Sequence, residues 1–97
     1  MSQTQATVEE IIKNNKVVIF SQPDSPYCEK AKKLLAQLNV QFFDVELPPK
    51  DVQQYLQEKT GQHDFPNIFI NEQHIGGYND LENLSRTEEL PKLLNKS

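Results

Sequence analysis

The feature that most constrains this chain is a short apolar segment followed closely by a helix start. Residues 17–20 read Val-Val-Ile-Phe, four consecutive apolar and mostly β-branched residues, which is typical of a strand buried on both faces. After a short turn, Ser25 is a good N-cap and Pro26 suits the first helical position. A buried strand that leads directly into a helix predicts an α/β domain.

The helix that begins here carries its apolar residues on one face, since they recur at helical intervals, at Tyr27, Ala31, Leu34, Leu35 and Leu38. Beyond it, apolar residues alternate with acidic ones over residues 43–47, which predicts a second strand. Strand, helix and strand in this order predict a βαβ unit with a right-handed crossover.

Two further helices are predicted on either side of this unit. Thr7 and Glu10 have the spacing of a capping box and predict a short helix, with residues 1–6 frayed before it. Residues 50–60 predict an exposed helix, and Gly61 suits the position just past its end.

The last third of the chain predicts a hairpin and one or two helices. Residues 67–71 form a third strand, and residues 74–75 a short fourth one after a turn. The following leucines are helical, and Pro91 falls in the first turn of the last helix if Thr87 caps it. The predicted order is α-β-α-β-α-β-β-α, in one domain over residues 1–97.

Composition excludes several classes of protein. One cysteine in 97 residues forms no internal disulfide and no multi-cysteine zinc site. The formal net charge of −4 argues against nucleic acid as a partner. No segment predicts a membrane span or a secretory signal, so we expect a soluble protein in a reducing, cytoplasmic compartment. We also expect a monomer.

The chain resembles the glutaredoxin family of the thioredoxin fold over nearly its whole length. The motifs that carry the resemblance are VVIFS (17–21), SPYC (25–28), AKKLL (31–35), FPNIFIN (65–71) and HIGGYNDL (74–81). The resemblance implies a thioredoxin-like, four-stranded mixed sheet flanked by helices. It also implies glutathione-dependent thiol–disulfide exchange, with glutathione as co-substrate, glutathionylated or disulfide-containing proteins as partners, and no metal.

The chain departs from the family at the catalytic position. The family's motif begins with a nucleophilic cysteine, whereas this chain has Ser25 there and keeps only Cys28. A thiol at a helix N-cap ionises readily, but an alcohol stays protonated and forms no disulfide. Ser25 is therefore expected to act as a helix cap. An introduced Cys→Ser replacement and a natural loss of the cysteine both fit the sequence.

Two interpretations of Cys28 stay open at this point. It is either a half-buried small hydrophobic residue with a sluggish thiol, or a reactive thiol near the helix N-terminus.

The resemblance also implies where glutathione binds. Pro66 would be a cis-proline that leaves the backbone of Phe65 free to pair with the cysteinyl part of glutathione. The helix that follows Gly76-Gly77 would bind the γ-glutamyl group, through the backbone of Asn79 and Asp80 and with the Asp80 side chain near the amino group. Alternatively, Asn79 merely caps that helix.

The other end of glutathione has weaker candidates. Gln62 aligns with a family position near the glycine carboxylate, although it is also one exposed amide among many. Gln22 stands where the family often has a lysine, so a cation is missing there, and Lys13, Lys16 and Lys30 are the candidates to substitute for part of it. Directly before Phe65, Asp64 stands where the family usually has a threonine, and its added negative charge would weaken the attraction for an anionic ligand.

The Tyr27 side chain either flanks the sulfur at the active-site turn or belongs to the hydrophobic core. We expect His63 and His74 to be surface and turn residues, because neither has metal-ligand spacing to a cysteine or carboxylate cluster.

These features favour a glutaredoxin-like oxidoreductase that Ser25 renders inactive or weak. The alternative is a non-catalytic glutathione- or protein-binding module of the same fold. Iron–sulfur cluster carriage is disfavoured, because the first cysteine is absent.

Overall fold

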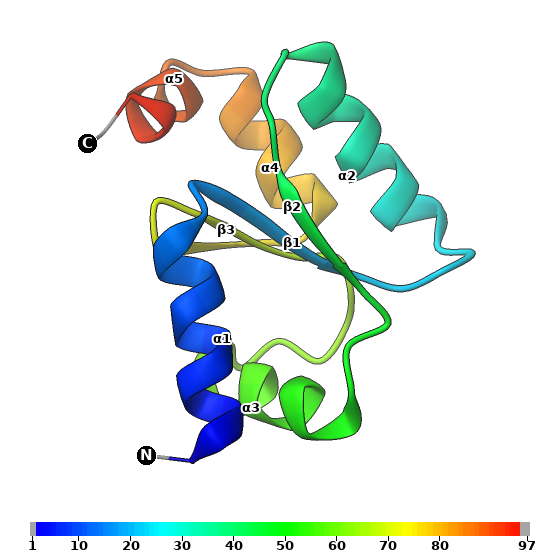
Figure 1. Ribbon diagram of the computed structural model, residues 1–97. Helices are drawn as coiled ribbons and strands as arrows, with labels where there is room; N and C mark the ends of the chain where they lie inside the picture. Colours follow the sequence, from blue (N-terminus) through cyan, green and yellow to red (C-terminus); the bar gives the residue numbers. More distant parts are fainter. Residues whose placement is uncertain (1, 96–97) are drawn as a thin grey trace.

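The computed structural model describes residues 2–95, and Figure 1 shows how its elements are arranged. In chain order the elements are α1 (Gln3–Asn14), β1 (Val17–Ser21), α2 (Pro26–Gln37), β2 (Phe43–Glu46), α3 (Lys50–Thr60), β3 (Asn67–Ile70), β4 (Gln73–Gly76), α4 (Tyr78–Ser85) and α5 (Glu89–Leu94). This order confirms the predicted succession, with two separate helices at the end.

The four strands form one mixed sheet in the order β2-β1-β3-β4. β1 pairs in parallel with β2 and antiparallel with β3, and β3 and β4 form the antiparallel hairpin. All five residues of β1 are buried, and they include the four consecutive apolar residues predicted to be buried on both faces. β1 therefore lies inside the sheet, and its C-terminal end carries the turn into α2.

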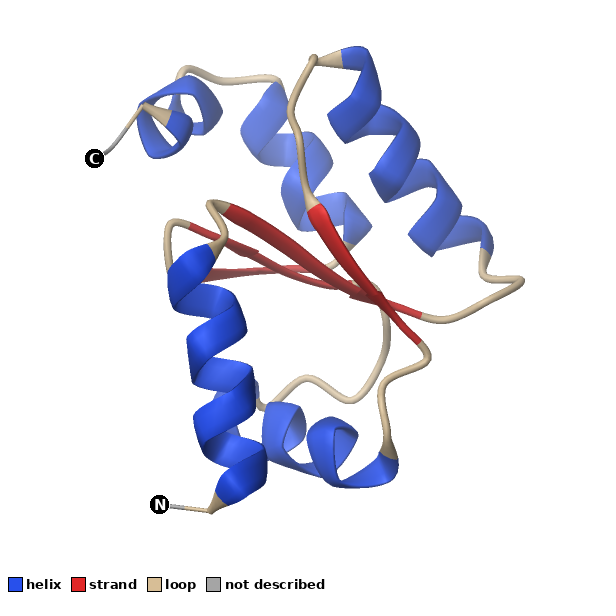
Figure 2. Ribbon diagram, in the orientation of Figure 1, coloured by secondary structure: helices blue, strands red, loops and turns tan. Residues whose placement is uncertain are grey.

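Helices cover both faces of the sheet, as Figure 2 shows. Val17 and Ile19 of β1 pack in a core cluster with residues of α2 and α4, whereas Val18 and Phe20 pack in a second cluster with residues of α1 and α3. Successive side chains of a strand point to opposite faces. The continuous apolar run is thus explained by two cores, one on each side of β1.

The first helix begins earlier than the sequence predicted. α1 starts at Gln3, because the Ser2 hydroxyl caps it by accepting a hydrogen bond from the Gln5 N–H at 3.0 Å. Thr7 is therefore inside the helix, and the predicted frayed segment is wrong for residues 2–6. Met1 lies outside the described residues.

Three apolar side chains of the predicted second strand and of the helix before it are more exposed than expected. β2 ends at Glu46, because Leu47 has a positive φ of 52° and its side chain is 63% exposed. Phe43 is also exposed, and its neighbour Phe42 packs against the core instead. Leu38 is exposed just past the end of α2.

The hairpin and the last helix differ slightly from their predicted bounds. β3 ends at Ile70, because Asn71 and Glu72 both have positive φ, as a tight two-residue hairpin turn requires. Glu88 is the N-cap residue of α5, although the Thr87 hydroxyl accepts a hydrogen bond from the Glu89 N–H at 3.1 Å. Pro91 lies in the first turn, as predicted. Across residues 2–95, no helix has the length and apolar character that a membrane span needs.

Candidate functional site

The turn after β1 places Ser25 at the N-terminus of α2. Pro26 is the first helical residue, and the Ser25 hydroxyl accepts a hydrogen bond from the Cys28 N–H at 3.4 Å. Ser25 is therefore the N-cap that the sequence predicted. An atom at this position faces the positive end of the helix dipole and the free N–H groups of the first turn.

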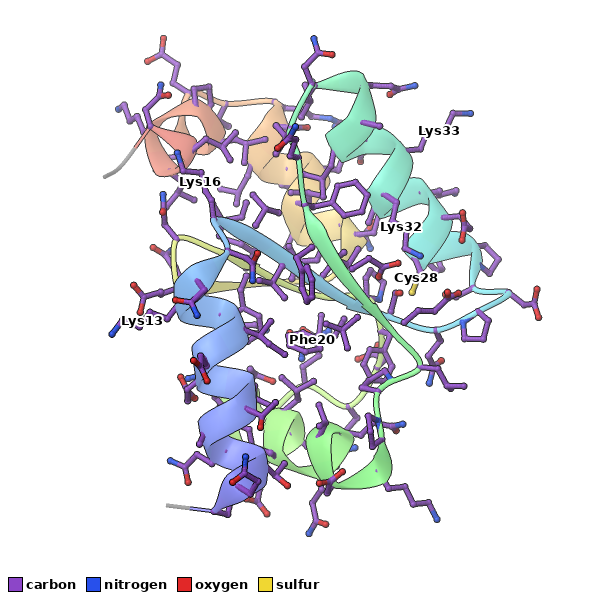
Figure 3. The ribbon with its side chains drawn as sticks, viewed as in Figure 1. Lys13, Lys16, Phe20, Cys28, Lys32 and Lys33 are labelled. Atoms are coloured by element: carbon purple, nitrogen blue, oxygen red, sulfur yellow. The ribbon has the colours of Figure 1, made fainter. Side chains whose placement is uncertain are left out.

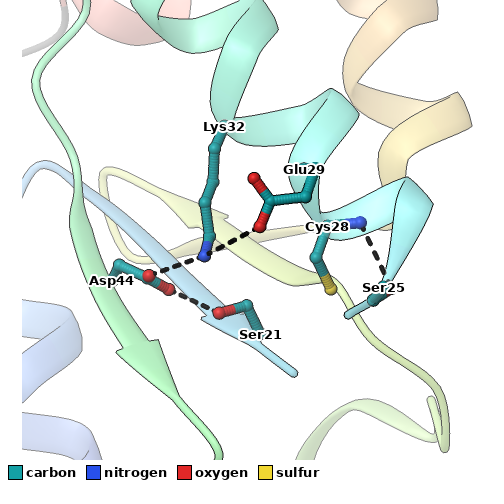
Figure 4. Close-up of polar contacts among 6 residues, drawn as sticks. All are labelled: Ser21, Ser25, Cys28, Glu29, Lys32 and Asp44. Carbon is teal, nitrogen blue, oxygen red and sulfur yellow. Dashed lines mark hydrogen bonds and ion pairs between the residues drawn. The ribbon is translucent and has the colours of Figure 1, made fainter. Parts of the chain in front are cut away.

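Cys28 is fully buried, so the predicted half-buried side chain is wrong. Figure 4 shows its sulfur below the first turn of α2, on the side of the end of β1. Side-chain sulfur in this place contributes apolar packing. The thiol is therefore out of reach of a disulfide in solution in this structure.

A polar network beside this turn connects α2 to two strands (Figure 4). The Lys32 ammonium lies 2.8 Å from Asp44 Oδ2, and the buried Ser21 hydroxyl donates a hydrogen bond of 2.6 Å to Asp44 Oδ1. Burial alone would lower the pKa of Lys32, but the contact with Asp44 outweighs it and raises that pKa. The sequence contained no signal for this network, because its members are far apart along the chain.

A pocket of about 400 Å³ lies beside the N-terminus of α2. It is lined by the start of α2, the α3–β3 connection and the start of α4, through Tyr27, Gln62, Asp64, Phe65, Pro66, Gly77, Tyr78, Asn79 and Asp80. Six predicted site residues therefore line one pocket, namely Tyr27, Gln62, Phe65, Pro66, Asn79 and Asp80. Gln22 is exposed and does not line it, and Ser25 and Cys28 lie outside the lining.

The α3–β3 connection forms one wall. The peptide bond between Phe65 and Pro66 is cis, as the resemblance implied, and Pro66 is buried. Gln62 Nε2 donates two hydrogen bonds of 2.8 Å, to the carbonyl oxygens of Asp64 and Pro66. Both amide hydrogens of Gln62 thus hold the connection in shape.

The N-terminus of α4 forms the facing wall. Gly77 is the N-cap residue, and Asp80 Oδ2 accepts a hydrogen bond from the Gly77 N–H at 3.0 Å. Asn79 is the second residue of the helix, so the alternative that it caps α4 is wrong. Gly76 has a φ of +122°, and a Cβ there would lie 2.4 Å from Asp80 Oδ2. Any larger residue at position 76 would force the Asp80 side chain to shift from this position.

Two tyrosines and a lysine form the rim. Tyr27 is 55% exposed, so it does not belong to the core. Its ring centroid lies 6.2 Å from that of Tyr78, and Lys30 Nζ lies 5.3 Å and 5.9 Å from the centroids of Tyr27 and Tyr78. A hydrogen bond to Glu82 raises the pKa of Tyr78. Tyr78 was not among the predicted site residues, although its place directly after Gly76-Gly77 could have indicated it.

Of the three candidate lysines for the missing cation, Lys30 is the one that lies near the site, over the rings of Tyr27 and Tyr78. Figure 3 shows Lys13 and Lys16 on the opposite side of the molecule from Cys28. Lys16 Nζ donates a hydrogen bond to the Leu94 carbonyl oxygen near the C-terminus.

The two histidines lie in different environments. His63 is exposed, as predicted, but His74 lies in β4, and its ring packs 5.3 Å from that of Phe69. His74 Nε2 is buried and has no hydrogen-bond partner within residues 2–95, and burial lowers the pKa of this side chain. The prediction of a surface or turn residue is thus wrong for His74. The same stretch holds no group of three or more His, Cys, Asp or Glu side chains arranged to bind a metal.

This arrangement defines a class of protein. A mixed β2-β1-β3-β4 sheet, a helix start after β1 and a cis-proline in the same pocket wall are the features of the thioredoxin fold. Solved structures agree. A buckwheat glutaredoxin–glutathione complex has a TM-score of 0.88 and 32% identity, covering 94% of this chain and 86% of that one. A wheat glutaredoxin also has a TM-score of 0.88, with 38% identity, covering 95% of this chain and 91% of that one.

The sequence model of the Glutaredoxin family matches residues 17–75. Glutaredoxin-1 of Rhizophagus irregularis is 42% identical over 98 residues, covering 97% of each chain. Glutaredoxin-2 of Schizosaccharomyces pombe is 38% identical over 97 residues, covering 96% of this chain and 88% of that protein. The chain therefore belongs to the glutaredoxin family, a family of thiol–disulfide oxidoreductases.

Proposed function

We propose that this chain binds glutathione, or the glutathionyl group of a mixed disulfide, in the pocket between the α3–β3 connection and α4. The observation that carries the proposal is the pocket itself, because six residues that the family resemblance implied for a glutathione site line it together. A similar structure of a buckwheat glutaredoxin is a glutathione complex, which supports the same ligand here.

The walls of the pocket suit the parts of this tripeptide. The first-turn N–H groups of α4 favour a carboxylate, and the Asp80 carboxylate favours the neighbouring ammonium. Within residues 2–95 the backbone N–H and carbonyl of Phe65 make no hydrogen bond, so they are available to pair with the cysteinyl unit. Such contacts would hold the ligand sulfur near the N-terminus of α2.

We propose further that Ser25 makes this chain inactive or very weak as an oxidoreductase. In exchange, a thiolate attacks one sulfur of a disulfide, a new S–S bond forms, the old one breaks, and the second sulfur leaves as a thiolate. A cysteine at position 25 would have the helix N-terminus to stabilise its thiolate. Serine has no sulfur to form the mixed disulfide, and Cys28 is buried.

The test is the Ser25→Cys variant in glutathione-dependent reduction of a small disulfide. We expect a strong gain of turnover over the present chain. The double variant Ser25→Cys/Cys28→Ser shows whether Cys28 resolves the mixed disulfide or a second glutathione does. Gln37→Cys, which adds an exposed thiol at the far end of α2, is the matched control and should gain little.

A second candidate function is a non-catalytic binding module. The observation that favours it is that Ser25 serves as an ordinary helix cap while the only thiol of the chain is fully buried. A folded Ser25→Cys variant that binds glutathione without turnover would favour this module over the oxidoreductase. The disulfide substrates, the monomeric state and the cytoplasmic location stay predictions.

A further inference from the structure

The pocket has two walls of different electrostatic character. On the α4 side are the N–H groups of a helix N-terminus, and Lys30 lies over the rings of Tyr27 and Tyr78 at the rim. These groups favour negative charge. The Asp80 carboxylate beside them is partly satisfied by the Gly77 N–H. This wall suits a group that carries both a carboxylate and an ammonium.

Apart from the Phe65 N–H, which would pair with the cysteinyl unit, the polar side chains of the wall formed by the α3–β3 connection offer only acceptors to a ligand. Both hydrogens of the Gln62 amide are donated to backbone carbonyls, so its free polar atom is Oε1. Asp64 adds an exposed carboxylate that forms no ion pair within residues 2–95. None of the nine residues lining the pocket is Lys, Arg or His. The neighbouring His63 is exposed and lies outside the lining.

A second anion is therefore poorly accommodated. At neutral pH, free glutathione carries two carboxylates and one ammonium. With the γ-glutamyl end against α4, the other end of the ligand would extend toward the α3–β3 connection, where Asp64 would repel the glycyl carboxylate. A ligand with a neutral or positive group at that end avoids the repulsion.

We propose that the pocket prefers glutathione-type thiols whose terminal carboxylate is neutralised, as an amide or ester, or extended by an amine. Asp64 is the specificity-determining residue. This inference rests on the proposed function, since it names the ligand class of the same site.

Calorimetric titration of the full chain with reduced glutathione and with its glycine amide tests the inference. At about 0.01 M salt we expect the amide to bind about tenfold more tightly, and the difference to shrink at about 1 M salt, where such interactions are screened. Asp64→Asn should remove most of the difference by improving the binding of the free acid. Glu10→Gln, which removes one charge from an exposed position outside the pocket, should leave it unchanged.

The outcomes separate the two proposals. If both ligands bind but the free acid binds equally well or better, the inference is overturned and the proposed binding function stands. The inference is likewise overturned if Asp64→Asn and Glu10→Gln change the preference to the same extent. If neither ligand binds the folded protein, the proposed function is overturned, and the inference with it.

Discussion

The hydroxyl of Ser25 accepts a hydrogen bond from the backbone N–H of Cys28 across the first turn of α2. The two residues that the family uses for dithiol chemistry are thus joined here by a helix cap. The hydrogen bond is long, at 3.4 Å, which indicates a modest contribution to stability. The same N-cap geometry would stabilise a thiolate if residue 25 were a cysteine.

Ser25→Ala removes this cap and should destabilise the protein by about 0.5–1 kcal/mol, the lower part of the range for N-cap serines. Urea unfolding followed by circular dichroism measures the loss. Ser25→Asn keeps an acceptor at the N-cap and is the control, with an expected change close to zero. An equal loss in both variants would show that the hydroxyl does not act as a cap.

Asp44→Ala should cost about 1–3 kcal/mol, because it leaves the buried hydroxyl of Ser21 without its acceptor and Lys32 without its closest partner. Glu29→Ala is the matched control. Glu29 is 67% exposed in its side chain and lies 3.9 Å from Lys32, so its loss should cost less than about 0.5 kcal/mol. Comparable unfolding midpoints for the two variants would contradict the prediction.

Gly76→Ala should lower both stability and ligand affinity. The new Cβ would lie 2.4 Å from Asp80 Oδ2, and the φ of +122° is unfavourable for alanine, so we expect a loss of at least about 1 kcal/mol. Displacing Asp80 should also weaken glutathione binding in a calorimetric titration. Gly77→Ala is the control, because its Cβ would lie 3.7 Å from the Pro66 carbonyl oxygen, an ordinary contact. Equal effects of the two substitutions would argue against a role for the space around Asp80.

Tyr55→Phe should change how stability depends on pH. A hydrogen bond from the Tyr55 hydroxyl to Glu9 raises the pKa of Tyr55 to about 12 and lowers the pKa of Glu9. As the pH rises, the phenol of Tyr55 loses its proton in the unfolded chain at a lower pH than in the folded protein. The contribution of Tyr55 to the free energy of unfolding is therefore fully present below its ordinary pKa of 10.0 and is lost as the pH rises toward 12.

At low pH, Glu9 has the opposite effect. Its contribution to the free energy of unfolding is present above its ordinary pKa of 4.5 and is lost as the pH falls below that value. Part of this acid dependence should survive in Tyr55→Phe, because Lys59 still lies 2.9 Å from Glu9. Unfolding curves measured at intervals from pH 3 to 11 provide the comparison. If the stability of Tyr55→Phe depended on pH in the same way as that of the unchanged protein, the hydrogen bond between Tyr55 and Glu9 would not be the cause of the pKa shifts.

Much of the fold was predictable from short stretches of sequence. The apolar run of β1, the Ser25-Pro26 start of α2 and the end of α3 at Gly61 all follow from local rules. Burial in a strand, an N-cap and a left-handed C-cap each depend on a few adjacent residues. The predictions that failed concern how far local elements extend: Ser2 caps α1 in place of Thr7, and the positive φ of Leu47 ends β2 one residue early.

The candidate site was predictable only in part. The resemblance indicated six residues of the pocket, including the cis bond before Pro66. It did not indicate Tyr78 at the rim, nor the absence of Gln22 from the lining. Whether a polar side chain on a turn reaches a pocket depends on the path of the backbone around it, which residue type alone does not determine.

By itself, the sequence determined the order of the elements, the helix start at residue 25 and the loss of the family's first cysteine, because these are properties of neighbouring residues. Only the tertiary structure decided that Cys28 is fully buried, that Lys32 and Ser21 share Asp44, and that Asp64 lies in a pocket wall without a cation. Burial and charge pairing depend on which faces of distant segments meet. Ser21 and Asp44, for example, are 23 residues apart in the chain and come together only when β1 pairs with β2.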